Sequence, residues 1–185
     1  MAAKSTLLNM VLCLTAVCLV CSALLAFTYA VTVAPIAEAT QAKTNASIAR
    51  VLPAFTGNHE LCSVNVDGTD YTYYKVPGTG CAILVTTSGF GGPLSLMVGV
   101  REDGVVNNTV VLSHSETPGL GAKCQTDRNF IDQFKSWNPA ERKLSVKKDG
   151  GDVDAITAST ITSRAYTLAV ATAVKVYSSI SEQDE

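Results

Sequence analysis

The sequence has little charge and few of the side chains that catalyse reactions directly. Charged residues make up 16% of its 185 residues, the formal net charge is −2, and there are only two histidines. No long basic run is present, which argues against a nucleic-acid-binding protein. No nucleophile–base pair and no set of residues with metal-ligand spacing is visible either. We therefore expect neither a catalytic residue nor a metal site, and a function that does not depend on the chain's own acid–base chemistry.

Charge is missing altogether between Ser5 and Ala37, and the segment from Leu7 to Ala30 is almost wholly apolar. About 20 apolar residues span a bilayer as a helix, so the sequence predicts a single transmembrane anchor over residues 1–34. Lys4, the only charge before the anchor, favours an N-terminus inside and a domain outside. A cleaved signal peptide is the alternative, although its apolar core usually has only about 7–15 residues.

The remaining length fits one domain of about 150 residues or fewer. A polar segment rich in small residues follows Pro35 and predicts a stalk or linker over residues 35–60. We expect an extracytoplasmic domain over residues 61–180 and a polar tail over residues 181–185.

Six cysteines fall into two groups of three. Cys13, Cys18 and Cys21 lie inside the apolar segment, where a free cysteine behaves as a small apolar residue, so their C-x-x-C spacing does not indicate a metal site. The other three are Cys62, Cys81 and Cys124. One disulfide with a spare thiol is possible among them outside the membrane, and the sequence does not select the pair.

Short runs of β-branched and aromatic residues, separated by glycine-bearing turns, predict an antiparallel meander. The strands are expected at Tyr71–Val76, Cys81–Thr87, Leu94–Val100 and Val105–Leu112. Asp103-Gly104 is a strong hairpin-turn signal between the last two.

Helices are expected after the strands, which makes the predicted fold class α+β. A short helix over Asp127–Lys135 has Asp127 as its N-cap and ends before Pro139. The basic segment Arg142–Lys148 predicts an exposed hairpin with a solvated charged face. An apolar helix from Ala165 to about Ser178 is expected to pack against the sheet.

Five hydroxyl side chains lie just before that last helix, at Thr157, Ser159, Thr160, Thr162 and Ser163. Ser163 or Thr162 is predicted as the N-cap, because a short side-chain oxygen satisfies free N–H groups of the first turn. Those N–H groups and the helix dipole favour an anion, so a phosphate near Thr160 would be stabilised, with Arg164 as a further donor. An ordinary Thr/Ser-rich helix start is the simpler interpretation.

Two loops accompany this turn. Gly89-Phe90-Gly91-Gly92 separates two predicted strands, where glycine allows either a plain turn or a close approach to a ligand. Glu116-Thr117-Pro118-Gly119-Leu120-Gly121 follows the last strand, and its Pro-Gly pair predicts a type II turn. His114 stands alone and gives no catalytic signal.

These three segments resemble, in the same order, the signatures of the FMN-binding domain family. In that family a dedicated transferase links FMN through its phosphate to the last Thr of a motif in which Asp, two variable residues and Ser/Thr-Gly-Ala-Thr precede a helix. The resemblance implies Thr160 as the acceptor and Asp154 and Thr157 as recognition positions, with Ile161 beside them. Ala158 stands where Gly is usual and would be penalised at positive φ. Ser159 stands where Ala is usual and offers a competing hydroxyl.

The Gly89–Gly92 segment resembles the family's Gly-aromatic-Gly-Gly loop, and Glu116–Gly121 matches its Glu-Thr-Pro-Gly-Leu-Gly loop without a change. The resemblance implies that both loops bind the cofactor, through backbone N–H groups and the Thr117 hydroxyl.

Together with the N-terminal anchor, these motifs resemble the G-subunit family of Rnf complexes. That resemblance implies a covalently flavinylated electron carrier in an ion-translocating ferredoxin:NAD oxidoreductase of the inner or plasma membrane, with other membrane subunits and a flavin transferase as partners. Without the other subunits of its complex, the chain is not expected to catalyse a reaction.

Three other functions remain as alternatives. They are the C subunit of the sodium-translocating NADH:quinone oxidoreductase, a membrane-anchored binding or assembly module that has lost the flavin, and an electron-delivery domain that feeds an extracellular reductase.

Overall fold

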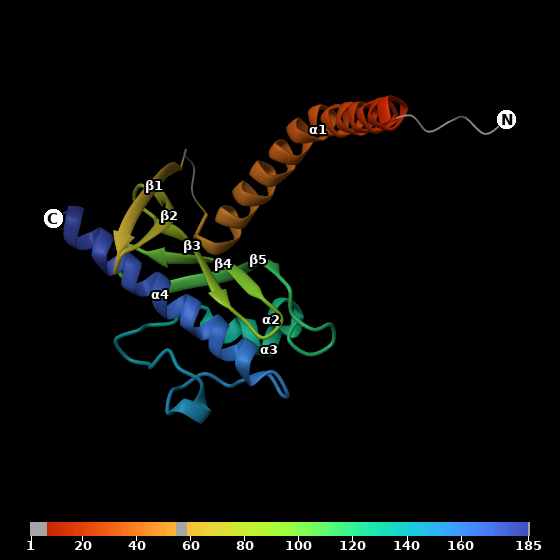
Figure 1. The fold of residues 1–185 in the computed structure, drawn as a ribbon. Coiled ribbons are helices and arrows are strands. Elements are labelled where there is room, and N and C mark those ends of the chain that lie inside the picture. The colour runs from red at the N-terminus through yellow and green to blue at the C-terminus, as the bar shows by residue number, and fades with distance from the viewer. Residues whose placement is uncertain (1–6, 55–58, 185) are drawn as a thin grey trace. The chain divides into compact units, whose positions relative to one another are not determined.

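The computed structural model describes residues 7–54 and 59–184, in two compact units over residues 1–44 and 45–185. Helix α1 (Leu7–Val51) runs through the first unit and ends in the second (Figure 1). It continues past Pro35, so the predicted stalk is helical as far as Val51. Lys4, residues 55–58 of the predicted linker and residue 185 of the predicted tail lie outside the described residues.

The first unit is an apolar helix with exposed side chains. Its most apolar 18-residue window has a mean hydropathy of 2.7, which by length and composition is enough to cross a membrane. The hydroxyls of Thr15, Thr28 and Thr32 donate to backbone carbonyls four residues earlier, at 2.7–3.0 Å. Their polar groups are therefore satisfied within the helix, as an apolar solvent requires.

The second unit is built on a five-stranded antiparallel sheet in which every strand pairs with its neighbours in the sequence. Its strands are β1 (Glu60–Val66), β2 (Thr69–Val76), β3 (Gly80–Ser88), β4 (Pro93–Arg101) and β5 (Val106–His114). The four predicted strands are confirmed, whereas β1 was not predicted. The sequence did carry a signal for it: Asp67-Gly68 joins β1 to β2 as a two-residue turn with φ of 53° and 78°, as a type I′ hairpin turn requires.

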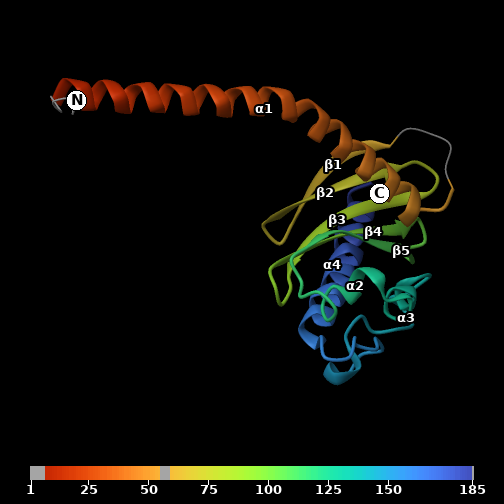
Figure 2. The same ribbon diagram turned by 90° about the vertical axis from the view of Figure 1, so that its right-hand side faces the viewer.

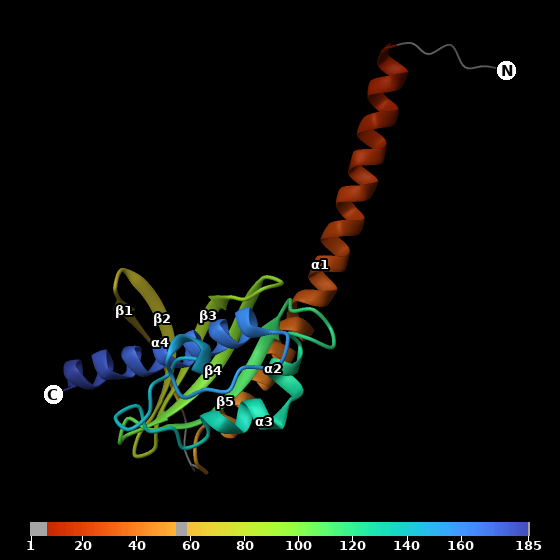
Figure 3. The ribbon, with the colours of Figure 1, turned by 90° about the horizontal axis from the view of Figure 1, so that it is seen from below.

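One face of the sheet packs against the C-terminal helix α4 (Thr160–Asp184), which crosses the strands in Figure 3. Alternate residues of β4, among them Leu96 and Val98, are buried with Tyr166 and Val170 of the helix. The predicted α+β fold is therefore observed. Helix α4 is longer than predicted, since it begins at Thr160 and takes in most of the predicted polar tail.

The opposite face of the sheet is covered by the last turns of α1, visible in front of the strands in Figure 2. Ile48 and Val51 are buried there with Met97, whose neighbours in β4 face α4. The amides of Asn107 and Asn108 donate to the carbonyls of Val51 and Arg50, at 2.8 and 2.9 Å. These bonds satisfy carbonyls that the end of a helix leaves free.

Between β5 and α4, short helices enclose an aromatic cluster. They are α2 (Lys123–Thr126), α3 (Arg128–Ile131) and η1 (Asp132–Phe134). Asp127 caps α3 as predicted, with its carboxylate accepting from the Asn129 N–H. The buried Phe134 ring packs against the rings of both Trp137 and Tyr166, and the Tyr166 hydroxyl lies 2.6 Å from Thr109 Oγ1. Burial raises the pKa of Tyr166.

The basic segment Arg142–Lys148 does not form the predicted hairpin. A short helix, η2 (Lys147–Asp149), occupies its end, and Val146 makes a single parallel bridge to Val153. Its charges are not simply solvated, because the Arg142 guanidinium lies 3.7 Å from the centre of the Trp137 ring. A tight turn at Gly150, with φ of 76°, replaces the expected second strand.

All six cysteines lie within the described residues, and none of them forms a disulfide. Cys13, Cys18 and Cys21 are exposed on α1, Cys62 is half-buried, and Cys81 and Cys124 are buried. Burial, together with the nearby Glu116 carboxylate, raises the pKa of the Cys124 thiol to about 11. This thiol is therefore protonated at neutral pH and unreactive.

Candidate functional site

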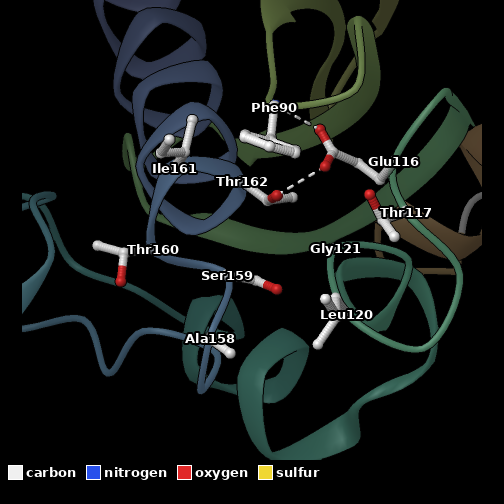
Figure 4. Close-up of a pocket in the computed structure, with 10 residues that line it drawn as sticks. All are labelled: Phe90, Glu116, Thr117, Leu120, Gly121, Ala158, Ser159, Thr160, Ile161 and Thr162. Carbon is white, nitrogen blue, oxygen red and sulfur yellow. Dashed lines mark hydrogen bonds between the residues drawn. The ribbon is translucent and has the colours of Figure 1, made fainter.

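A cavity of about 370 Å³ lies where three segments that are distant in the sequence meet. The β3–β4 loop contributes Phe90, the loop after β5 contributes one wall, and the turn before α4 contributes the other (Figure 4). The lining residues are Phe90, Glu116, Thr117, Leu120, Gly121, Ala158, Ser159, Thr160, Ile161 and Thr162. The structure thus brings together residues from all three predicted motifs.

Glu116 connects the three segments. Its carboxylate accepts from the N–H groups of Phe90 and Gly91, at 2.8 and 3.4 Å, and from the hydroxyl of Thr162, at 2.7 Å. Figure 4 shows the side chain between Phe90 and Thr162. Only 5% of Glu116 is exposed, so these bonds replace water around a buried charge.

Two glycines make room for this carboxylate. A Cβ atom built on Gly89 or on Gly121 would overlap with a carboxylate oxygen of Glu116. Side chains at these positions would therefore push the carboxylate away from its donors, which explains glycine at the edge of each loop.

The turn before α4 is strained at one residue. The Ser159 N–H donates to the Ile156 carbonyl at 3.0 Å, and Ala158, the third residue of this turn, has φ of 63°. A turn with positive φ at the third position is a type II turn, which favours glycine there. Ala158 therefore adopts the positive φ at which the sequence analysis expected an alanine side chain to be unfavourable.

The predicted N-cap is wrong. Thr162 and Ser163 are buried inside α4, and the Ser159 carbonyl accepts the first helical bond, from the Ser163 N–H at 3.0 Å. The Ser163 hydroxyl instead accepts from the Ile156 N–H at 2.9 Å and donates to the Ser159 carbonyl at 2.9 Å. Ser163 thus fastens the turn to the helix, and Thr162 fastens the helix to Glu116.

The two candidate hydroxyls differ in their surroundings. Ser159 is buried, with its hydroxyl directed toward Leu120 and Gly121 in Figure 4. Thr160 is half-buried at the edge of the cavity, and its hydroxyl accepts from the Lys148 ammonium at 3.2 Å. Thr160 is therefore more accessible than Ser159.

Helix η2 contacts the turn and the residues that flank it through three successive side chains. Lys147 pairs with Asp154 at 2.7 Å, Lys148 contacts Thr160, and Asp149 forms a two-pronged pair with Arg164 at 2.6 Å. The hydrogen bonds from Arg164 lower the pKa of Asp149. Sequence reasoning missed these roles, because it assigned the basic segment to a solvated face.

Three apolar side chains stand open around the cavity. Phe90 is 68% exposed, Leu120 45% and Ile161 50%. Large exposed apolar side chains that surround a cavity are typical of a ligand site. A planar aromatic ligand would cover them.

The other predicted residues do not line the cavity. Gly89, Gly91 and Gly92 shape the loop behind Phe90, and Pro118 and Gly119 form the predicted turn, with φ of 76° at Gly119 and the Leu120 N–H donating to the Thr117 carbonyl. Asp154 and Thr157 are exposed. His114 lies beside Gln125 at 3.1 Å, and within the described residues no group of three potential metal ligands occurs.

Comparison with known proteins gives the family. The model of the FMN-binding domain matches residues 89–175, which contain every lining residue of the cavity. The G subunit of the ion-translocating oxidoreductase complex of Shewanella piezotolerans is 30% identical over 90% of this chain and 87% of its own length. The corresponding G subunit of Shewanella baltica is 32% identical over 84% and 82%.

The chain belongs to this G-subunit family. Another similar protein is the G subunit of the Na⁺-translocating ferredoxin:NAD⁺ oxidoreductase complex of Acetobacterium woodii, 39% identical over 52% of this chain and 47% of its own length. The cavity fits the FMN of its matched domain, because it offers apolar side chains for an aromatic ring and the Thr160 hydroxyl for a phosphate, with the Lys148 ammonium beside that hydroxyl.

Thr162 and Lys148 are the two residues of this G-subunit site that the motifs did not reveal. Thr162 lines the cavity and binds Glu116, although it had been assigned to a helix cap. Lys148 precedes Thr160 by twelve residues and reaches it only through the fold of η2.

Proposed function

We propose that this chain is the flavin-carrying G subunit of an Rnf-type ion-translocating ferredoxin:NAD oxidoreductase, with FMN attached through its phosphate to Thr160. The observation that carries the proposal is the cavity where Phe90, the Glu116–Gly121 loop and the Thr160 turn meet. The FMN-binding domain match and the names of the full-length relatives support it. Bound flavin would supply the electron transfer, and the protein its position and surroundings.

Different residues of the chain would bind the flavin ring, position the loops and provide the attachment oxygen. Phe90, Leu120 and Ile161 would pack on the ring and exclude water, since all three are open beside the cavity. Glu116 would act as a positioning residue, because its hydrogen bonds hold the Phe90 loop to α4. The Thr160 hydroxyl would provide the ester oxygen.

Attachment would exchange one phosphorus–oxygen bond for another. The Thr160 oxygen bonds to the phosphorus of a flavin donor while the bond to the leaving group breaks, and the hydroxyl proton passes to a base of the transferase. With a flavin dinucleotide as donor, the leaving group is a nucleoside monophosphate. Oxidation states do not change in this step.

We also propose that α1 anchors the protein in the inner or plasma membrane, with residues 61–180 on the outer side, among other membrane subunits of the complex. The hydropathy of α1 supports the anchor. Attachment through a phosphoester would keep FMN from diffusing away in a compartment where free flavin is scarce. The relatives above carry the G-subunit name, which favours an Rnf-type complex over the sodium-translocating NADH:quinone oxidoreductase.

The test is in-gel flavin fluorescence after full denaturation, on protein coexpressed with a flavin transferase. Wild type should fluoresce, Thr160→Ala should be dark, and the matched control Ser159→Ala should fluoresce like wild type. A fluorescent Thr160→Ala protein would contradict attachment at this residue.

A binding or assembly module without flavin is the second candidate, and the strained Ala158 is the observation that favours it. A dark wild type, under conditions in which the transferase modifies a known substrate, would support this candidate instead.

A further inference from the structure

We propose that Lys148 is a phosphate-binding residue of this site, whose ammonium neutralises the phosphate of a flavin at Thr160. The proposal rests on the proposed function and assigns a role to a residue outside the three motifs and outside the cavity lining. Its starting observation is the 3.2 Å contact between Lys148 Nζ and Thr160 Oγ1.

The cations around the turn have different partners. Lys147 is paired with the Asp154 carboxylate and Arg164 with the Asp149 carboxylate. Among the described side chains that contact this turn, Lys148 is the one cation whose hydrogen-bond partner is a neutral hydroxyl. The charge of Lys148 also acts on the neighbouring Asp149 carboxylate, but its hydrogen bond goes to a hydroxyl, so an incoming anion would not have to displace a bonded carboxylate as it would at the other two cations.

The chemistry of a phosphoester fits this position. The nonbridging oxygens of the phosphate lie two bonds from the ester oxygen, so a cation that contacts Thr160 Oγ1 is within reach of them. Lysine suits this task because its ammonium is a compact charge on a flexible stem with three donors. The phosphate would also meet the free N–H groups at the start of the 25-residue helix α4.

Helix η2 explains how Lys148 is held in place. Its neighbours on both sides are fixed to residues that flank the turn, Lys147 to Asp154 before it and Asp149 to Arg164 in α4. The backbone of Lys148 is therefore held at two points while its side chain stays exposed. Such an arrangement positions a charge without burying it.

The experiment compares FMN with riboflavin, which lacks the phosphate, on the full-length protein in detergent, made without a transferase. Quenching of flavin fluorescence gives both affinities for wild type, Lys148→Gln, Lys148→Arg and the matched control Lys143→Gln, which changes an exposed lysine of the same basic segment. Lys148→Gln should weaken FMN binding about three- to tenfold, the range expected for one exposed charge-assisted contact, and leave riboflavin binding unchanged. Lys148→Arg should retain most of the FMN affinity, and 1 M salt should abolish the difference.

Parallel losses for FMN and riboflavin, or an equal effect of Lys143→Gln, would overturn the proposal. A second measurement, the rate of covalent flavin incorporation with purified transferase, separates the two proposals. Incorporation at the wild-type rate in Lys148→Gln would contradict the role of Lys148 and leave attachment at Thr160 intact. No incorporation into wild type would contradict attachment, while the FMN–riboflavin comparison would still decide on Lys148.

Discussion

The two walls of the cavity are held by different interactions. The wall around Glu116 is fixed by a buried carboxylate with three donors, and its loop matches the family motif without a change. The wall from Ile156 to Thr160 contains a strained alanine and is held from outside by exposed charges of η2. The first wall is therefore expected to determine whether the domain folds, and the second how well it binds a phosphate.

The largest effect is expected at the buried wall. Glu116→Ala leaves one buried donor, the Thr162 hydroxyl, and two part-buried N–H groups without this acceptor, and it should lower the free energy of unfolding by about 3 kcal/mol. For a chain of this length the midpoint of thermal unfolding should fall by roughly 6–12 °C. Circular dichroism of the detergent-solubilised protein measures it.

Glu141→Ala is the matched control, because Glu141 is exposed, and it should change stability by less than about 0.5 kcal/mol. Equal midpoints for the two variants would show that Glu116 does not hold the walls together.

An intermediate effect of opposite sign is expected at the strained turn. Ala158→Gly removes the cost of a side chain at φ of 63° and should stabilise the protein by about 1 kcal/mol, with an increased rate of flavin attachment. Chemical denaturation measures the first effect and in-gel fluorescence the second.

Ala140→Gly provides the contrast, since Ala140 is exposed and is not among the residues with positive φ. Because glycine increases the conformational entropy of the unfolded chain, Ala140→Gly should lower the free energy of unfolding by about 0.5–1 kcal/mol. The same sign for both substitutions would contradict strain at Ala158.

The smallest effect is expected at the exposed charges. Asp149→Asn removes the pair with Arg164, which lowers the pKa of Asp149 in the folded state. Because the pKa of Asp149 is lower in the folded state, the pair stabilises the protein at pH values above the unfolded pKa of about 4. This contribution is lost as the pH falls through the folded pKa. The difference in unfolding midpoint between wild type and variant should thus be present at pH 7 and absent near pH 2. A difference that persists at pH 2 would mean that the pair is not its cause.

Much of this structure follows from local sequence patterns. Four strands, the Asp103-Gly104 turn and the Asp127 cap were predictable because each depends on neighbouring residues. Strand β1 was missed because its alternation is weak and its turn at Asp67-Gly68 was overlooked.

The site was predictable only in part. The three motifs identified most of the cavity wall, since each motif is a continuous segment. The link through Thr162 and the reach of Lys148 to Thr160 depend on how α4 and η2 pack, and no local pattern encodes those distances. The helix start was misplaced because several hydroxyls compete for the cap, and burial of Thr162 and Ser163 decides the outcome.

The position of α4 after all five strands in chain order has a consequence for biosynthesis. The sheet joins only strands that are neighbours in the sequence, so it can form progressively as the chain emerges. The wall from Ile156 to Thr162 and the helix that covers the sheet come last. A nascent chain that stops before this segment lacks one wall of the cavity, so a modifying enzyme that recognises the folded turn can act only after the turn and α4 have been made.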